Sequence, residues 1–113
     1  MPSARVKVLM AVFAAVAHHV ASAQAAPDAA TVKPLLVKGT CRGCHAVDKK
    51  VVGPAYHQVA AKYKDDPKAV DMLAEKIVKG GSGAWGPIPM PSAIAPAEAK
   101  ILAAWVLASV PAH

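Results

Sequence analysis

The chain has 113 residues, a formal net charge of +6 at pH 7, two cysteines and only 4 % aromatic residues. This length suits one small domain with a limited hydrophobic core. The modest positive charge is spread evenly along the chain, which argues against the concentrated basic surface of a nucleic-acid-binding protein.

Residues 1–23 have the layout of a secretory signal peptide. Arg5 and Lys7 precede an apolar run that starts at Val8, and small residues end the segment. The run is too short to span a bilayer, and no other stretch is long enough. An uncleaved N-terminal anchor is the alternative interpretation. We therefore expect a secreted, soluble domain over residues 24–113, with 11 basic and 7 acidic side chains.

Two short helices are expected on either side of the cysteine-containing segment. Apolar residues at helical spacing predict the first helix over residues 31–39, closed by Gly39. Pro34 is tolerated only in the first turn of this helix. A second pattern at spacings of three and four predicts a helix over residues 55–64.

The second half of the mature chain predicts two more helices and one irregular loop. Asp66 as N-cap and Pro67 at the first helical position open the third helix, which ends at Gly80. The stretch GGSGAWGPIPMPSAIAP is too rich in Gly and Pro for regular structure, and the last helix starts at Pro96. Since no segment alternates like a strand, the fold class is all-α.

The segment CRGCH carries the chemistry of the chain. Residues three apart face the same way in a helical turn, so Cys41 and Cys44 can form thioethers with two vinyl groups on one porphyrin edge. His45 then projects its imidazole toward the iron, and C-x-x-C-H is the attachment sequence of a c-type haem. A zinc site, a redox dithiol and a disulfide are weaker alternatives. A buried porphyrin would also complete the core of this small domain.

The sixth iron ligand decides the function. A Met or His there gives an electron carrier, whereas an open position gives oxygen or peroxide chemistry. Met90 is held between two prolines, which present it at low entropic cost, although a gap-filling role is the alternative. The third-helix methionine is expected in the core, one histidine on the surface and the other at the frayed C-terminus. These three residues are Met72, His57 and His113.

The segments CRGCH, VGPAY, WGPIPMP and AAWVL occur in this order over nearly the whole mature chain. In order and spacing they resemble the small class I bacterial cytochromes c of the cytochrome c-551 (c8) family. The resemblance implies four or five short helices wrapped around one covalently bound haem c. It also implies that Cys41 and Cys44 attach the haem and that His45 and Met90 are its axial ligands.

The resemblance assigns three further residues to the haem. The Pro54 carbonyl would accept a hydrogen bond from the His45 ring, which fixes the imidazole and raises its basicity. Trp85 would hydrogen-bond a haem propionate, and Lys76 would lie near the same acid group. Trp105 would be structural, in the contact between the last and first helices.

The function implied by the resemblance is that of a periplasmic, monomeric one-electron carrier in a respiratory chain, and not of an enzyme. It would pass electrons from a cytochrome bc-type donor to a terminal oxidase or reductase such as nitrite reductase. The alternative is a haem protein with an open distal site that acts as a sensor or a peroxidase-like enzyme. We expect docking through an apolar patch with a basic rim, formed by Val51, Val52, Ile88 and Pro89 and by Lys38, Arg42, Lys49 and Lys50.

Overall fold

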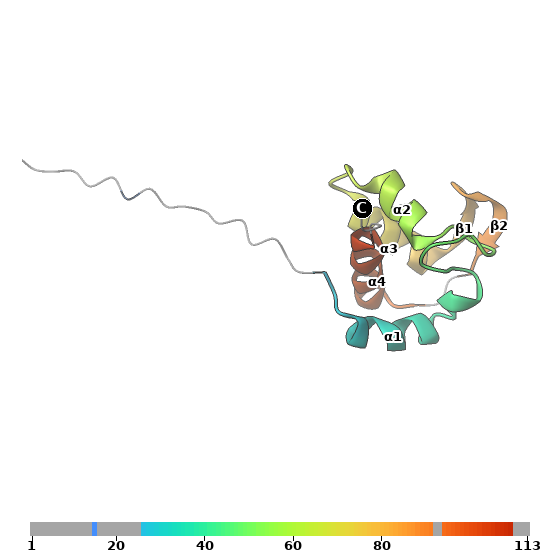
Figure 1. Ribbon diagram of the computed structural model, residues 1–113, viewed down its shortest axis with the longest axis horizontal. Helices are drawn as coiled ribbons and strands as arrows, with labels where there is room; N and C mark the ends of the chain where they lie inside the picture. Colours follow the sequence, from blue (N-terminus) through green and yellow to red (C-terminus); the bar gives the residue numbers. More distant parts are fainter. Residues whose placement is uncertain (1–14, 16–25, 92–93, 110–113) are drawn as a thin grey trace, which may run out of the picture.

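The structure, a computed structural model, describes Ala15, residues 26–91 and residues 94–109 (Figure 1). The rest of the expected signal peptide and His113 lie outside the described residues. None of the described helices is long and apolar enough to cross a membrane.

Four α-helices, one 3-10 helix and one small sheet make up the described part of the chain. In chain order they are α1 (Ala29–Lys38), η1 (Cys41–Gly43), α2 (Tyr56–Tyr63), α3 (Ala69–Lys79), β1 (Gly81–Gly83), β2 (Gly86–Met90) and α4 (Pro96–Ala108). The mostly helical architecture that the sequence predicts is therefore confirmed. Figure 1 shows α1 along the bottom of the view and the β1–β2 hairpin at its right-hand edge.

Helix α1 begins two residues before the predicted start. The Asp28 carboxylate caps it by accepting a hydrogen bond from the Thr31 backbone N–H at 2.7 Å. Pro34 consequently lies beyond the first turn, and the prediction that it would lie within that turn is wrong. Because Pro34 has no N–H, the Ala30 carbonyl loses its intrahelical partner.

Helix α3 begins later than predicted. The Asp66 side chain accepts a hydrogen bond from the Lys68 backbone N–H at 2.8 Å, two residues on, and closes a local turn before the helix. Lys68 is the N-cap, so the prediction of Asp66 in that role is wrong. The helix ends at Gly80, as predicted, where φ is 69°. Helix α4 starts at Pro96, also as predicted.

The Gly- and Pro-rich stretch after α3 contains a small antiparallel hairpin, which corrects the prediction that it has no regular structure. Gly81 pairs with Met90 and Gly83 pairs with Gly86, with an irregularity between the two pairs. Gly83 and Gly86 have φ values of 122° and 115°, which non-glycine residues rarely adopt. Glycine therefore permits a tight turn that the composition alone did not indicate.

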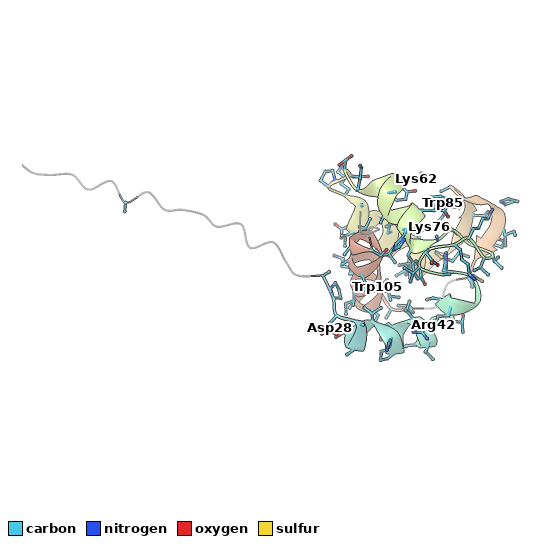
Figure 2. All side chains as sticks on the ribbon, viewed as in Figure 1. Asp28, Arg42, Lys62, Lys76, Trp85 and Trp105 are labelled. Carbon is cyan, nitrogen blue, oxygen red and sulfur yellow. The ribbon has the colours of Figure 1, made fainter. Side chains whose placement is uncertain are left out.

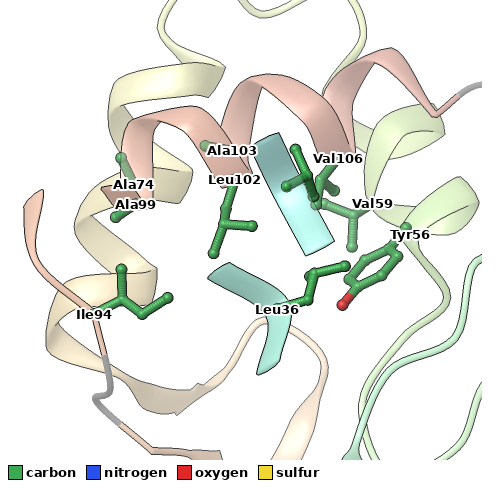
Figure 3. Close-up of a cluster of buried hydrophobic side chains, with 10 residues drawn as sticks. Leu36, Tyr56, Val59, Ala74, Ile94, Ala99, Leu102, Ala103 and Val106 are labelled. Atoms are coloured by element: carbon green, nitrogen blue, oxygen red, sulfur yellow. The ribbon is translucent and has the colours of Figure 1, made fainter. Parts of the chain in front are cut away.

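The core is built around α4 (Figure 3). Small residues at Ala74 on α3 and at Ala99 and Ala103 on α4 are buried and allow these two helices to approach closely. The buried cluster consists of Val32, Leu36, Tyr56, Val59, Ala74, Ile94, Ala99, Leu102, Ala103 and Val106. Met72 is 38 % exposed, so its predicted place in the core is wrong. It lies one position before Leu73, which turns it away from the packed face of α3.

Candidate haem-binding site

A single cavity of about 310 Å³ collects every site residue that the sequence predicts. The six that line it are Cys41, Cys44, His45, Pro54, Trp85 and Met90. Its volume falls within the usual range for cofactor pockets, about 300–1,000 Å³. Leu36, Ile94, Leu102 and Val106 belong both to the cavity lining and to the buried cluster. The cavity is thus continuous with the hydrophobic core.

The two cysteines lie at either end of one helical turn. The backbone N–H groups of Cys44 and His45 both donate to the Cys41 carbonyl, at 3.2 and 3.0 Å. Burial raises the pKa of the Cys41 thiol, whereas redox-active dithiols usually have a lowered one. The two cysteines form no disulfide. In the described part of the chain, no group of three or more His, Cys, Asp or Glu side chains is arranged to hold a metal ion.

His45 is oriented by the loop that follows it. Its Nδ1 atom lies 2.8 Å from the Pro54 carbonyl oxygen. A carbonyl oxygen can only accept, so Nδ1 carries the hydrogen and Nε2 keeps the lone pair that a metal requires. The tautomer that this contact selects is therefore the one suited to an axial ligand.

Two residues that the sequence did not single out for the site also fix His45. A Cβ atom added to Gly53 would lie 2.9 Å from Nδ1 of His45 and 3.0 Å from Nε2, closer than side chains approach one another. The Tyr56 ring stacks on the imidazole with centroids 5.4 Å apart and an interplanar angle of 21°. Trp105 packs edge-on against Tyr56 at 5.2 Å. Gly53, Pro54 and Tyr56 of the VGPAY segment thus surround the His45 ring.

The Tyr56 hydroxyl is buried, and no hydrogen-bond partner for it lies among the described residues. Burial is the largest cause that raises the pKa of this phenol. The side chain is 7 % exposed and belongs to the buried cluster. Tyr56 therefore contributes its ring to the site, while its hydroxyl adds a desolvation cost.

Met90 lies at the end of β2, is half-buried and lines the same cavity as His45. The other two described candidates for the sixth ligand do not line it. Met72 is exposed on α3, and His57 is half-buried on α2. Of the described methionine and histidine candidates, only Met90 shares the cavity with His45.

Trp85 lies in the turn between the two strands and is 40 % exposed. Lys76, which the resemblance places near a propionate, lines the cavity with it. A second lysine, Lys62 of α2, lies with its Nζ atom 4.6 Å from the centre of the Trp85 ring. Figure 2 shows Lys62 and Lys76 on the same side of the molecule as Trp85. No sequence pattern indicates Lys62, because it lies 23 positions before Trp85.

The predicted docking patch is only partly assembled as expected. Val51, Val52 and Ile88 are 48 %, 44 % and 63 % exposed, a large exposure for apolar side chains. Lys38, however, donates to both carboxylate oxygens of Glu98 at 2.8 and 3.0 Å. Its charge is thereby partly compensated, so we remove it from the proposed basic rim.

Comparison with known proteins identifies close relatives. The profile of the cytochrome c family, described as "Cytochrome c", matches residues 29–109. The chain is 49 % identical to cytochrome c-551 of Pseudomonas denitrificans over 78 residues, which cover 68 % of this chain and 95 % of that protein. It is 56 % identical to cytochrome c-552 of Hydrogenobacter thermophilus over 68 residues, 59 % of this chain and 69 % of that protein.

Two solved structures resemble this fold with equal TM-scores. Wild-type cytochrome c552 of Nitrosomonas europaea is 48 % identical, with a TM-score of 0.64, over 68 % of this chain and 98 % of that one. The class 1 cytochrome MtoD of Sideroxydans lithotrophicus ES-1 is 29 % identical, with the same TM-score, over 74 % of this chain and 98 % of that one.

Proposed function

The chain belongs to the class I cytochrome c-551 family, and we propose that it is a periplasmic electron carrier. We propose His45 and Met90 as its axial haem ligands. It is a small c-type cytochrome that binds one haem c covalently through Cys41 and Cys44. We further propose a cytochrome bc-type complex as donor and a terminal oxidase or reductase, such as nitrite reductase, as acceptor. In this role the protein is not itself an enzyme.

The observation that carries the ligation is the meeting of His45 and Met90 in one cavity with both cysteines. The haem, when bound, supplies one-electron exchange at its iron. The polypeptide presents His45 through Nε2, because Nδ1 donates to Pro54. Met90 would supply a thioether ligand, which favours reduced iron and would raise the potential. The apolar cavity wall excludes water from the site.

The surface beside the cavity supports an encounter with an acidic redox protein. Val52, Ile88 and Pro89 line the cavity mouth, and Lys50 lines it as well. Lys49 is exposed next to Lys50. A positive rim around an apolar centre attracts an acidic partner and lets the contact exclude water. We therefore propose that electrons leave and enter through this face.

Carbon monoxide binding tests the ligation and separates the two candidate functions. If Met90 occupies the sixth position, carbon monoxide should barely change the visible spectrum of the reduced protein. Rapid and complete carbon monoxide binding would instead indicate the open distal site of a sensor or peroxidase-like enzyme. Such a result would reject the electron-carrier proposal as stated.

Covalent attachment has its own test. The haem should stay with the polypeptide on denaturing electrophoresis and stain there. Changing both Cys41 and Cys44 to Ser should abolish the stained band, because no thioether can then form. A wild-type band without haem stain would contradict the attachment.

A further inference from the structure

Lys62 lies on the exposed side of α2, outside the set of residues assigned to the haem. We propose that Lys62 is a positioning residue that holds the tip of the β1–β2 hairpin against α2 and thereby keeps Met90 in place. The proposal rests on the proposed ligation by Met90 and adds a residue to it.

Three contacts place the Lys62 ammonium group at the hairpin tip. Its Nζ atom lies 4.6 Å from the centre of the Trp85 ring and 5.4 Å from the centre of the Tyr63 ring. It also donates to the Ala84 backbone carbonyl at 3.4 Å. A cation within about 6 Å of an aromatic face is attracted by the ring quadrupole. One side chain thus contacts two consecutive residues of the turn, Ala84 and Trp85.

The hairpin has little else within the polypeptide to hold it. All residues of β1 and β2 are exposed except Met90, which is half-buried. In the described part of the chain, the extensive contacts of the hairpin are those between its own two strands. Its glycines also lose more conformational entropy on ordering than other residues do. A single contact from a helix can therefore shift the balance between a closed and an open hairpin.

The hairpin geometry connects its tip to the ligand. Gly83 pairs with Gly86 near the turn, and Gly81 pairs with Met90 at the open end. Because the two strands are short and share this one ladder, a displacement of the turn displaces β2 and the residue at its end. Releasing Lys62 should therefore raise the population in which Met90 has left its position, with no change to the surroundings of His45.

The experiment compares Lys62→Gln with the control Lys64→Gln in the ferric holoprotein. Lys64 is exposed at the C-cap of the same helix, so the control removes the same charge from a neighbouring position. Imidazole should bind the Lys62→Gln protein about two- to fivefold more tightly than wild type, because it enters only when Met90 leaves. The control should bind imidazole as wild type does.

Two readouts separate the contact from a simple change of charge. Lys62→Arg keeps a cation that can lie over the ring, and it should restore wild-type imidazole affinity. In a Trp85→Ala background, Lys62→Gln should have a smaller effect than in wild type, because the two residues act through one contact. Full additivity of the two substitutions would overturn the proposed contact.

Amide hydrogen exchange gives a readout that does not depend on the iron. The backbone amides of Gly83 and Gly86, which pair next to the turn, should exchange about two- to fivefold faster in Lys62→Gln and remain unchanged in Lys64→Gln. If both variants match wild type in exchange and in imidazole affinity, the positioning role is wrong. If the wild-type protein binds carbon monoxide freely, the Met90 ligation fails instead, and the exchange data alone then decide whether Lys62 holds the hairpin.

Discussion

The two sides of the cavity are built in opposite ways. The segment after Cys44 is fixed by hydrogen bonds that run between its own residues, whereas the hairpin that carries Met90 depends on few contacts. Val51, Val52, Gly53 and Tyr56 of the first segment all donate backbone hydrogen bonds within the region of residues 44–56.

Several separate contacts fix the His45 side of the cavity. The backbone N–H groups of Val52 and Gly53 both donate to the Cys44 carbonyl, at 3.2 and 2.7 Å. The N–H group of Tyr56 donates to the Ala46 carbonyl at 3.0 Å. The ring of His45 is then bonded on one atom and stacked on one face. Contacts within the polypeptide thus orient the His45 ring.

The Met90 side illustrates the other strategy. All residues of its two strands except Met90 are exposed, and its turn is held by the contact of Lys62 with Trp85. Regions with few buried contacts open with a low free-energy cost. We therefore expect substitutions near His45 to lower the stability of the fold. Substitutions in the hairpin should instead affect ligation by Met90 and leave the fold intact.

Met90→Ala should give the largest effect, because it removes the proposed ligand on the hairpin side of the cavity. We expect carbon monoxide to bind the reduced variant readily and the potential to fall by on the order of 0.1 V, within the roughly 0.8 V that axial ligands control. The helical circular dichroism signal should stay at its wild-type value. Met72→Ala is the control, since Met72 is exposed on α3 and does not line the cavity. Unchanged carbon monoxide reactivity in Met90→Ala would mean that Met90 is not the ligand.

Gly53→Ala should disrupt the packing around His45. The added Cβ would meet Nδ1 of His45 at 2.9 Å and force the ring away from the Pro54 carbonyl. We expect a loss of about 1–3 kcal/mol in the free energy of unfolding, as for an overpacked core, measured with denaturant. Gly43→Ala is a matched control, because its Cβ would meet no atom of the described residues within 4 Å. Equal stabilities of the two variants would refute the tight packing at Gly53.

Reversing two charges tests which side of the cavity attracts a partner. The hairpin from Gly81 to Met90 has no charged side chain, whereas Lys49 and Lys50 lie on the His45 side. Lys49→Glu with Lys50→Glu should slow electron transfer to an acidic acceptor about tenfold at low salt. The deficit should shrink near physiological salt, where the Debye length is about 8 Å.

The control for this reversal is Lys64→Glu with Lys68→Glu, which changes the net charge equally at residues that do not line the cavity. Stopped-flow rates over a salt series would measure both pairs. Equal rates for the two double variants at low salt would place the recognition elsewhere, and the potential should be close to wild type in each.

Tyr56→Phe should give the smallest effect, and it tests what the buried Tyr56 hydroxyl contributes to stability. It removes a buried hydroxyl without a described partner and keeps the stacked ring, so stability at pH 7 should change by less than about 1 kcal/mol. Burial raises the folded-state pKa of Tyr56 above its ordinary value of 10.0. The neutral phenol therefore supports the fold fully below pH 10.0, and this contribution is lost as the pH rises above it.

Denaturant unfolding at pH 7 and at pH values above 10 would check the prediction. The free energy of unfolding should fall less steeply with pH in Tyr56→Phe than in wild type. Tyr63→Phe, which removes the same atom at the other end of α2, serves as the control. A Tyr56→Phe protein that lost stability with pH as steeply as wild type would show that this phenol does not contribute.

The haem, its attachment and the helical class could all be predicted from short segments of the sequence. The spacing of Cys41, Cys44 and His45 is local chemistry that needs one helical turn, and η1 supplies it. The prolines around Met90 likewise marked the one described methionine that lines the cavity. Signals confined to a few neighbouring residues survive folding, because their geometry hardly depends on the rest of the chain.

The contacts between distant segments could not be predicted and became visible in the folded protein. The Lys62 contact with Trp85, the pairing of Lys38 with Glu98 and the exposure of Met72 depend on how helices and hairpin pack. The hairpin itself was missed because its glycines adopt positive φ values that favour a turn without an alternating pattern. Side-chain contacts over tens of residues carry no periodic signal, since they arise from the packing angles of whole elements.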